Sequence, residues 1–117
     1  MRDRVAPRVE VGALARQHIR RARTIRVFAS STESGYVAAS GSVTIAGPAL
    51  ALKVVRRSIA VAGGGAELAV KLTLTQHRQA LRALRRRRAV KVRLNVVATD
   101  RAGNSREARA VTIRLLR

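Results

Sequence analysis

Apolar and polar residues alternate over most of this chain, which is the pattern of β-strands that bury one face. The clearest run ends at Asp100 and has an apolar residue at every second position. Its predicted inward-facing residues are Val90, Val92, Leu94, Val96 and Ala98. The run that ends at residue 75 alternates in the same way, with Leu68, Val70, Leu72 and Leu74 on the predicted inner face. Both runs therefore predict strands with one buried side.

Shorter alternating runs add strands on either side of these two. Their predicted inward-facing residues are Val9 and Val11, then Ile25, Val27 and Ala29, and finally Val111, Ile113 and Leu115. Small and β-branched residues over 35–62 continue the pattern, with Gly41 as the expected site of a bulge and Gly63–Gly65 as a turn. Six or seven short strands separated by turns predict an antiparallel sandwich.

One segment, residues 75–88, changes from the strand period to the helix period. Its apolar face holds Ala80, Leu81 and Leu84, and its opposite face holds Arg78, Arg82 and Arg85. Thr75 is the expected N-cap, and the four arginines at 85–88 lie at the C-terminal end, where cations suit the helix dipole. The pattern predicts one short basic helix before the penultimate strand.

Segment 13–23 leaves two alternatives open. Leu14, His18, Ile19 and Ala22 would share one face of a short helix, with arginines on the other face. An irregular basic turn fits the same residues.

The length of 117 residues corresponds to one domain, because domains usually have about 100–150 residues. Residues 1–7 are predicted to be a linker, and residues 8–117 to form the domain. No run approaches the ~18 apolar residues of a membrane helix, and no apolar signal segment follows the basic start. We therefore expect neither a membrane span nor a signal peptide within this chain.

The formal net charge is +19, with 22 arginines and 3 lysines. Such an excess favours polyanionic partners: nucleic acid, anionic lipid or acidic polymers of the cell envelope. A second explanation is codon bias, because a GC-rich genome enriches proteins in arginine and alanine. Composition alone does not separate the two.

The candidate polyanion-binding residues are the arginines of the predicted helix: Arg78, Arg82, Arg85, Arg86, Arg87 and Arg88. They would contact anionic groups without reading a base sequence. Phe28 and Tyr36 are the two aromatic residues of the chain, so bases would find few rings on which to stack. The alternative is that this face is only solvated, as most charged helix faces are.

Asp100, Gly103 and Asn104 form a polar cluster with three interpretations. A calcium site needs about 6–8 oxygen ligands, and the cluster offers few carboxylates in a strongly positive chain. Acid–base catalysis needs a positioned pair or a histidine beside a nucleophile, and His18 and His77 are distant in sequence. A hairpin turn needs only an Asp that accepts backbone N–H groups and a Gly with positive φ. We therefore predict a structural turn, and no catalytic residue, metal or cofactor.

The segment ATDRAGN at 98–104, followed by a final alternating run, resembles the terminal hairpin of bacterial immunoglobulin-like modules. The order strand, basic helix, strand and hairpin from Leu68 to the end is similar to theirs, and DRVAP at 3–7 resembles their interdomain linker and first strand. These modules occur in tandem in large exported proteins, notably of actinobacteria. The resemblance implies an antiparallel immunoglobulin-like sandwich of about seven strands.

The resemblance also implies a function. It favours a non-catalytic structural, spacer or adhesion module of a larger exported bacterial protein, outside the cell or at its surface. The expected partners are neighbouring domains of the same polypeptide and anionic envelope polymers, and nucleic-acid binding through the arginine-rich helix is the alternative. Related modules often carry a cysteine pair where this chain has Ala29 and Gly35, and this chain has no cysteine, so no disulfide is expected.

Overall fold

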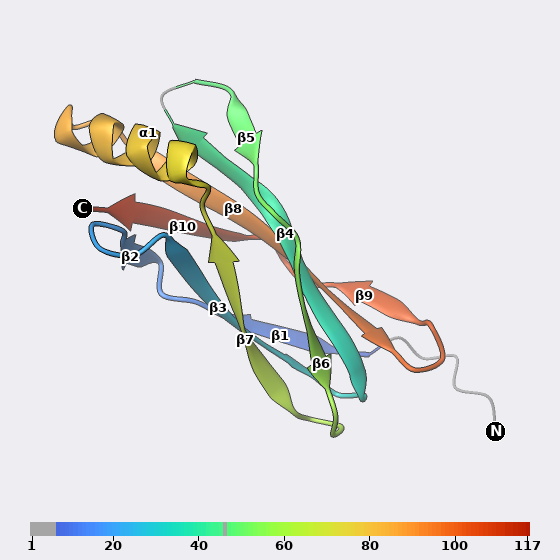
Figure 1. Cartoon of the computed structure of the whole chain (residues 1–117). Coiled ribbons are helices and arrows are strands. Elements are labelled where there is room, and N and C mark those ends of the chain that lie inside the picture. Colours follow the sequence, from blue (N-terminus) through green and yellow to red (C-terminus); the bar gives the residue numbers. More distant parts are fainter. Residues whose placement is uncertain (1–6, 46) are drawn as a thin grey trace.

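The computed structural model describes residues 7–45 and 47–117, which form ten strands and one helix (Figure 1). The strands are β1 (Val9–Gly12), β2 (Arg16–His18), β3 (Thr24–Ser31), β4 (Gly35–Ile45), β5 (Ala49–Ala51), β6 (Val55–Ile59), β7 (Gly65–Lys71), β8 (Val90–Asp100), β9 (Ser105–Glu107) and β10 (Val111–Leu116). The helix, α1 (Leu74–Arg85), connects β7 to β8. The prediction of a mainly β chain with one helix is confirmed. Except for Pro7, the predicted linker lies outside the described residues.

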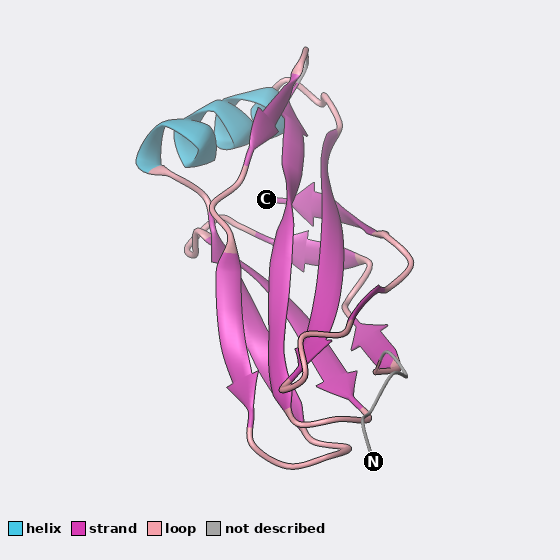
Figure 2. Cartoon of the chain, turned by 90° about the vertical axis from the view of Figure 1, so that its right-hand side faces the viewer, coloured by secondary structure: helices cyan, strands magenta, loops and turns pink. Residues whose placement is uncertain are grey.

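The strands form two sheets that pack around one core. The small sheet has the order β1-β3-β7. The large sheet has the order β2-β10-β8-β4-β5, with β6 also paired to β4 and β9 to β8. Among the described strands the pairs are antiparallel, except that β2 runs parallel to β10. The helix lies across one end of the two sheets (Figure 2).

The alternating runs supply the core, as predicted. None of the five inward-facing residues of β8 is more than 1% exposed, and those of β3 are buried as well. Leu74 is the exception, because 58% of its surface is exposed. That prediction is wrong because the chain leaves the small sheet after Lys71, and Leu74 is already the first residue of α1. The orientation of the helix is set by its buried residues, Ala80 and Ala83.

The longest ladder of the fold joins β4 to β8 over eleven successive residue pairs. The bulge predicted at Gly41 is therefore wrong, since Gly41 lies opposite Leu94 within this regular register. Glycine is needed there for another reason. A Cβ at position 41 would lie 1.9 Å from the carbonyl oxygen of Arg93, so only glycine lets the two strands approach this closely.

The helix begins with a capping box. The Thr73 Oγ1 accepts a hydrogen bond from the Gln76 N–H (3.1 Å), and the Gln76 Oε1 accepts one from the Thr73 N–H (3.0 Å). The N-cap predicted at Thr75 is therefore wrong by two residues. Threonine followed three residues later by glutamine is the sequence signature of this box, and the apolar alternation through Leu74 hides it.

The helix ends in a Schellman motif. The Arg88 N–H donates to the Ala83 carbonyl (2.9 Å), and the Arg87 N–H donates to the Leu84 carbonyl (3.0 Å). The residue in the left-handed conformation is Arg87, with a φ of 59°. Glycine is usual at this position, because a Cβ is crowded in the left-handed region.

Replacing Arg87 with glycine is expected to raise the free energy of unfolding by about 0.5–1 kcal/mol, because glycine adopts this φ without strain. Chemical denaturation of the wild type, Arg87→Gly and Arg87→Ala measures the effect. The alanine variant loses the same charge and keeps the Cβ. Equal stabilities of the two variants would contradict backbone strain at this position.

Segment 13–23 contains β2, so its helical alternative is wrong. Residues 16–18 pair with the edge of β10, and a bend follows at residues 20–21. The Gln17 side chain joins the two sheets, because its Nε2 donates to the Arg26 carbonyl (2.8 Å) and its Oε1 accepts from the Arg26 N–H (2.9 Å). A helix over these residues would leave the edge of β10 without the strand β2. It would also lose the two hydrogen bonds between the Gln17 side chain and the Arg26 backbone.

Candidate polyanion-binding surface

All six arginines predicted at the helix are exposed. Ala80 and Ala83 are buried against the core, so the arginines occupy the solvent side of α1 and the turn after it. Within the described part of the chain, the ion pair is that of Arg26 with Glu67 (3.2 Å), which lies in the small sheet. No described carboxylate therefore neutralises these six guanidinium groups at ion-pair distance.

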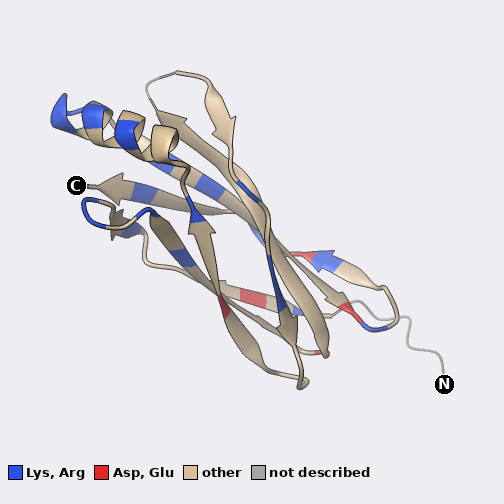
Figure 3. Ribbon diagram, in the orientation of Figure 1, with Lys and Arg blue, Asp and Glu red and all other residues tan. Residues whose placement is uncertain are grey.

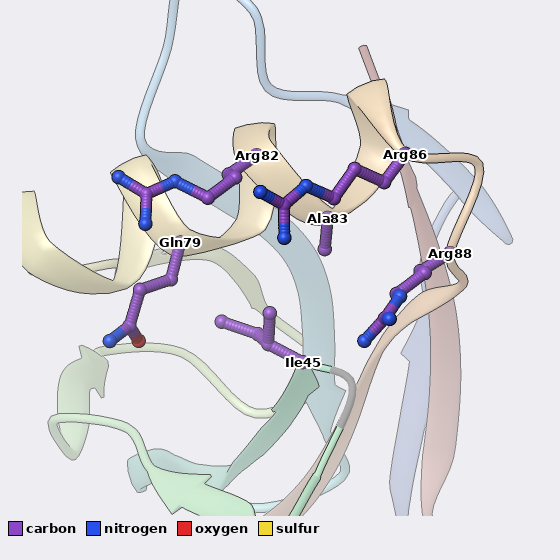
Figure 4. A pocket seen from close by; sticks show the side chains of 6 residues that line it. All are labelled: Ile45, Gln79, Arg82, Ala83, Arg86 and Arg88. Atoms are coloured by element: carbon purple, nitrogen blue, oxygen red, sulfur yellow. The ribbon is translucent and has the colours of Figure 1, made fainter.

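Half of the six arginines line one pocket of about 120 Å³ beside the helix (Figure 4). The lining residues are Arg82, Arg86 and Arg88, together with Gln79, Ala83 and Ile45. Residues 79, 82, 83 and 86 share one flank of α1, because the spacing i, i+3, i+4, i+7 returns to the same side of a helix. Arg78, Arg85 and Arg87 do not line this pocket.

Three of the lining residues were not predicted from the sequence: Gln79, Ala83 and Ile45. The helical spacing of Gln79 and Ala83 from Arg86 was a signal that could have found these two. Ile45 had no such signal, because it reaches the pocket only through the pairing of β4 with β8. The result is a pocket with three guanidinium donors, one amide and no carboxylate. Guanidinium groups bind phosphate and carboxylate groups with paired hydrogen bonds, so this chemistry fits an anion.

Charge is unevenly distributed over the molecule. Figure 3 shows lysine and arginine on α1 and at the neighbouring strand ends, whereas the acidic segments lie in the half away from the helix. The described acidic residues are Glu10, Glu33, Glu67, Asp100 and Glu107. An anion that approaches α1 therefore meets a positive potential with little local compensation.

Both histidines join separate segments of the chain. The His77 Nε2 lies 2.6 Å from the Ile19 carbonyl oxygen, and the His18 Nδ1 lies 2.6 Å from the Arg117 carbonyl oxygen. Neither histidine lies beside the polar cluster at Asp100 in the sequence. Over residues 7–45 and 47–117, no three histidine or carboxylate side chains lie close enough together to hold a metal ion.

The polar cluster forms a hairpin turn between β8 and β9. The Asp100 N–H donates to the Asn104 carbonyl (2.9 Å), and the Gly103 N–H donates to the Asp100 carbonyl (3.1 Å). The Asp100 carboxylate accepts the Asn104 N–H (2.8 Å) and the Asn104 side-chain amide (3.1 Å). Asp100, Gly103 and Asn104 thus lie where the turn needs an acceptor, a positive φ and a donor.

The strand after this turn is interrupted. β9 and β10 both pair with β8 along the edge opposite β4, so together they form the last strand. The Ala108 N–H donates to the Val96 carbonyl (2.8 Å) where the two pieces meet. The turn therefore joins the last two strands of the sandwich, as predicted, and the second of them has a break.

Hydrogen bonds in this turn set the pKa of Asp100. Burial of the carboxyl acts to raise this pKa, but hydrogen bonds from the Asn104 side chain and from the backbone of Asn104, Ala102 and Gly103 outweigh it. The pKa therefore lies below its ordinary value. Because the folded pKa is lower than the unfolded one, the carboxylate stabilises the fold above the unfolded pKa, and this contribution is lost as the pH falls through the folded pKa.

We expect Asp100→Asn to lower the melting temperature at pH 7. The difference from the wild type should shrink below about pH 4, near the ordinary pKa of an unfolded aspartate. Thermal unfolding of both proteins between pH 2 and pH 7 measures this difference. A constant difference over the whole range would contradict a role for the ionised carboxylate.

Gly103 has a φ of +88°, and a Cβ at this position would meet nothing within 4 Å. Gly103→Val is expected to lower the free energy of unfolding by about 1–2 kcal/mol, because a β-branched residue is strained at positive φ. Urea denaturation measures the loss, with Gly103→Asn as the control, since asparagine tolerates this conformation. Equal losses in the two variants would argue against φ as the cause.

The sequence matches no protein-family model, and no curated protein sequence is significantly similar to it. Among the described residues, no helix has the length and apolar character needed to cross a bilayer.

Proposed function

We propose that this chain is a non-catalytic immunoglobulin-like module that acts as a spacer or adhesion unit in a larger exported bacterial protein. The observation that carries this proposal is the order of the strands. Immunoglobulin-like sandwiches place strands A, B and E in one sheet and G, F, C and C′ in the other. In this chain β1, β3 and β7 are neighbours in one sheet, and β10, β8, β4 and β5 are neighbours in the other. Chain order then equates β3, β4 and β8 with B, C and F.

The positions of the chain ends support a tandem arrangement. The molecule measures 57 × 24 × 20 Å, and β1 enters from the half away from α1, whereas the chain ends after β10 on the side of α1 (Figure 1). A preceding and a following domain would then lie in line, and each module would add its length to the parent protein. This geometry favours neighbouring domains of the same polypeptide as partners. The location outside the cell is the part of the proposal that rests on the resemblance of residues 98–104 to modules of exported proteins.

A spacer must resist tension, and the pairing of β2 with β10 suggests how. The two strands are parallel, so a force that separates the chain ends slides one along the other and loads their hydrogen bonds together. Two of these bonds run from the Arg114 N–H to the Ala15 carbonyl (2.7 Å) and from the Ile19 N–H to the Leu116 carbonyl (2.8 Å).

Single-molecule stretching of the chain from its two ends tests this role. Gln17→Pro removes a backbone donor from the middle of β2 and should lower the unfolding force. Gln17→Ala, which removes only the side chain, is the matched control and should retain more of the force. Equal unfolding forces for the two variants would contradict a role in transmitting tension.

Polyanion binding at the helix is the second candidate function. The observation that favours it is the absence of any described carboxylate beside the six arginines, three of which share a pocket. This activity is compatible with the spacer role, because both use surfaces of one rigid sandwich. A titration with duplex DNA at several salt concentrations tests it.

A further inference from the structure

The outer face of the large sheet carries a row of positive charges that a spacer role does not explain. Arg114 of β10 lies opposite Lys91 of β8 on one side and opposite Arg16 of β2 on the other. All three side chains are exposed, and neighbouring strands are only about 4.8 Å apart. Like charges placed directly opposite each other destabilise a sheet. This charge row, formed by Arg16, Arg114 and Lys91, therefore lowers the free energy of unfolding as long as no anion is bound to it.

The face on which these charges lie follows from the burial of their neighbours. Val90 and Val92 flank Lys91 and are buried, and Ile113 and Leu115 flank Arg114 and are buried. Since side chains alternate along a strand, Lys91 and Arg114 point away from the core.

Small polar side chains continue this face beside the charges. Thr44 of β4 lies opposite Lys91. One step further along β8, Arg93 lies between Thr112 of β10 and Ser42 of β4, and Asn95 then lies opposite Ser40. The cations on β2, β10 and β8 thus lie beside hydroxyl and amide side chains on β4, β8 and β10.

Negative charge is distant on this face. The register places Glu107 opposite Val97, six residues along β8 from Lys91. At a rise of about 3.3 Å per residue, Glu107 is therefore about 20 Å from Lys91 along the strand direction. The charge row therefore has no carboxylate beside it among the paired positions of the large sheet.

We propose that this face binds a linear acidic polysaccharide. Arg16, Arg114, Lys91 and Arg93 would bind its anionic groups, and the neighbouring serine, threonine and asparagine side chains would contact its hydroxyl groups. Such a polymer alternates charged and hydroxyl groups along its length, which is the chemistry that the face presents. This site is separate from the helix pocket and goes beyond the spacer role, so its failure would leave the stretching test unaffected.

Single-stranded nucleic acid fits the face less well. Its bases need aromatic side chains for stacking, and Tyr36 lies at the far end of β4 with the guanidinium of Arg56 3.6 Å from its ring centre. Phe28 belongs to β3 of the small sheet. The charge row therefore has no stacking platform beside it.

Binding to polygalacturonate fragments of defined length tests the proposal, measured by calorimetry at about 0.15 M salt. The row variant carries Arg16→Gln, Lys91→Gln and Arg114→Gln. Its matched control, the distal variant, carries Arg8→Gln, Arg57→Gln and Arg101→Gln, three exposed arginines outside both the row and the helix, and loses the same charge. We expect the row variant to lose at least about tenfold in affinity, because three ion contacts are removed, and the distal variant to change less than about threefold.

Polyglutamate of equal charge and length shows whether the sugar itself contributes. The wild type should bind polygalacturonate more tightly than polyglutamate, and Ser42→Ala combined with Asn95→Ala should reduce that preference. Equal losses in the row and distal variants, no preference over polyglutamate, or no binding would each overturn the proposal. Tighter binding to single-stranded RNA than to polygalacturonate would instead favour the nucleic-acid alternative and would equally overturn it.

The unbound protein supplies an independent measurement. Because the row variant relieves repulsion between neighbouring strands, its melting temperature should exceed that of the wild type by about 2 °C or more. The same measurement shows that the variant is folded. A melting temperature that is unchanged or lower would contradict the repulsion from which the site is inferred.

Discussion

Leu94→Ala is expected to lower the free energy of unfolding by about 2–4 kcal/mol. Leu94 has no exposed surface, and it lies on β8 between β10 and β4, at the centre of the large sheet. Its side chain belongs to the same core cluster as Val70 and Leu72 of the small-sheet side. Truncation would leave a cavity where both sheets contribute atoms, and a loss of this size is a large share of the 5–15 kcal/mol typical of a domain.

Urea denaturation followed by circular dichroism measures this loss, and Arg93→Ala is the matched control. Arg93 is the adjacent residue of the same strand and points to solvent, so its removal should change stability by less than about 0.5 kcal/mol. Equal effects of the two substitutions would show that the inner and outer faces of β8 are exchanged, which is a register error of one residue.

Replacing the four arginines at 85–88 with glutamine is expected to weaken binding to duplex DNA and to lower its salt dependence. If each contacts one phosphate, the slope of log affinity against log salt falls by up to about 4, and affinity at about 0.1 M salt falls more than about a hundredfold. The reason is counterion release, since each neutralised phosphate frees bound cations. Fluorescence titrations at several salt concentrations measure both quantities, and RNA of equal charge density should behave in the same way.

The matched control replaces four exposed arginines far from the helix: Arg8, Arg57, Arg101 and Arg106. This variant loses the same charge and should retain most of the slope. If both variants lost the same amount, binding would not be concentrated at α1. A preference of about a thousandfold for one base sequence, the low end for specific binders, would contradict the spacer proposal and favour a nucleic-acid function.

The sequence by itself determined the buried faces of the strands. Val90 to Ala98 and Ile25 to Ala29 alternate with a period of two, and that period fixes which side chains share a face whatever the partner strand is. The change to the helix period determined α1 in the same way. The spacing of Asp100, Gly103 and Asn104 also determined a turn, because the hydrogen bonds of that turn lie within five residues of each other.

Tertiary structure decided what depends on pairs of distant segments. Residues 16–18 became a strand only because β10 offers an edge, and Gly41 lies in a regular ladder because the backbone of β8 passes close to it. Local alternation also hid the point at which the chain leaves β7, so Leu74 and the true N-cap were misplaced.

The same distinction applies to the two candidate binding surfaces. One flank of the helix pocket follows from helical spacing, but Ile45 joins it only through the ladder of β4 with β8. The charge row is decided wholly by register, since Arg16, Lys91 and Arg114 come from three separate parts of the chain. The periodicity of one strand shows to which face of the sheet a side chain points. Which residue lies beside it on the neighbouring strand depends on the register of the hydrogen bonds between the two strands. No single segment of the sequence contains that register.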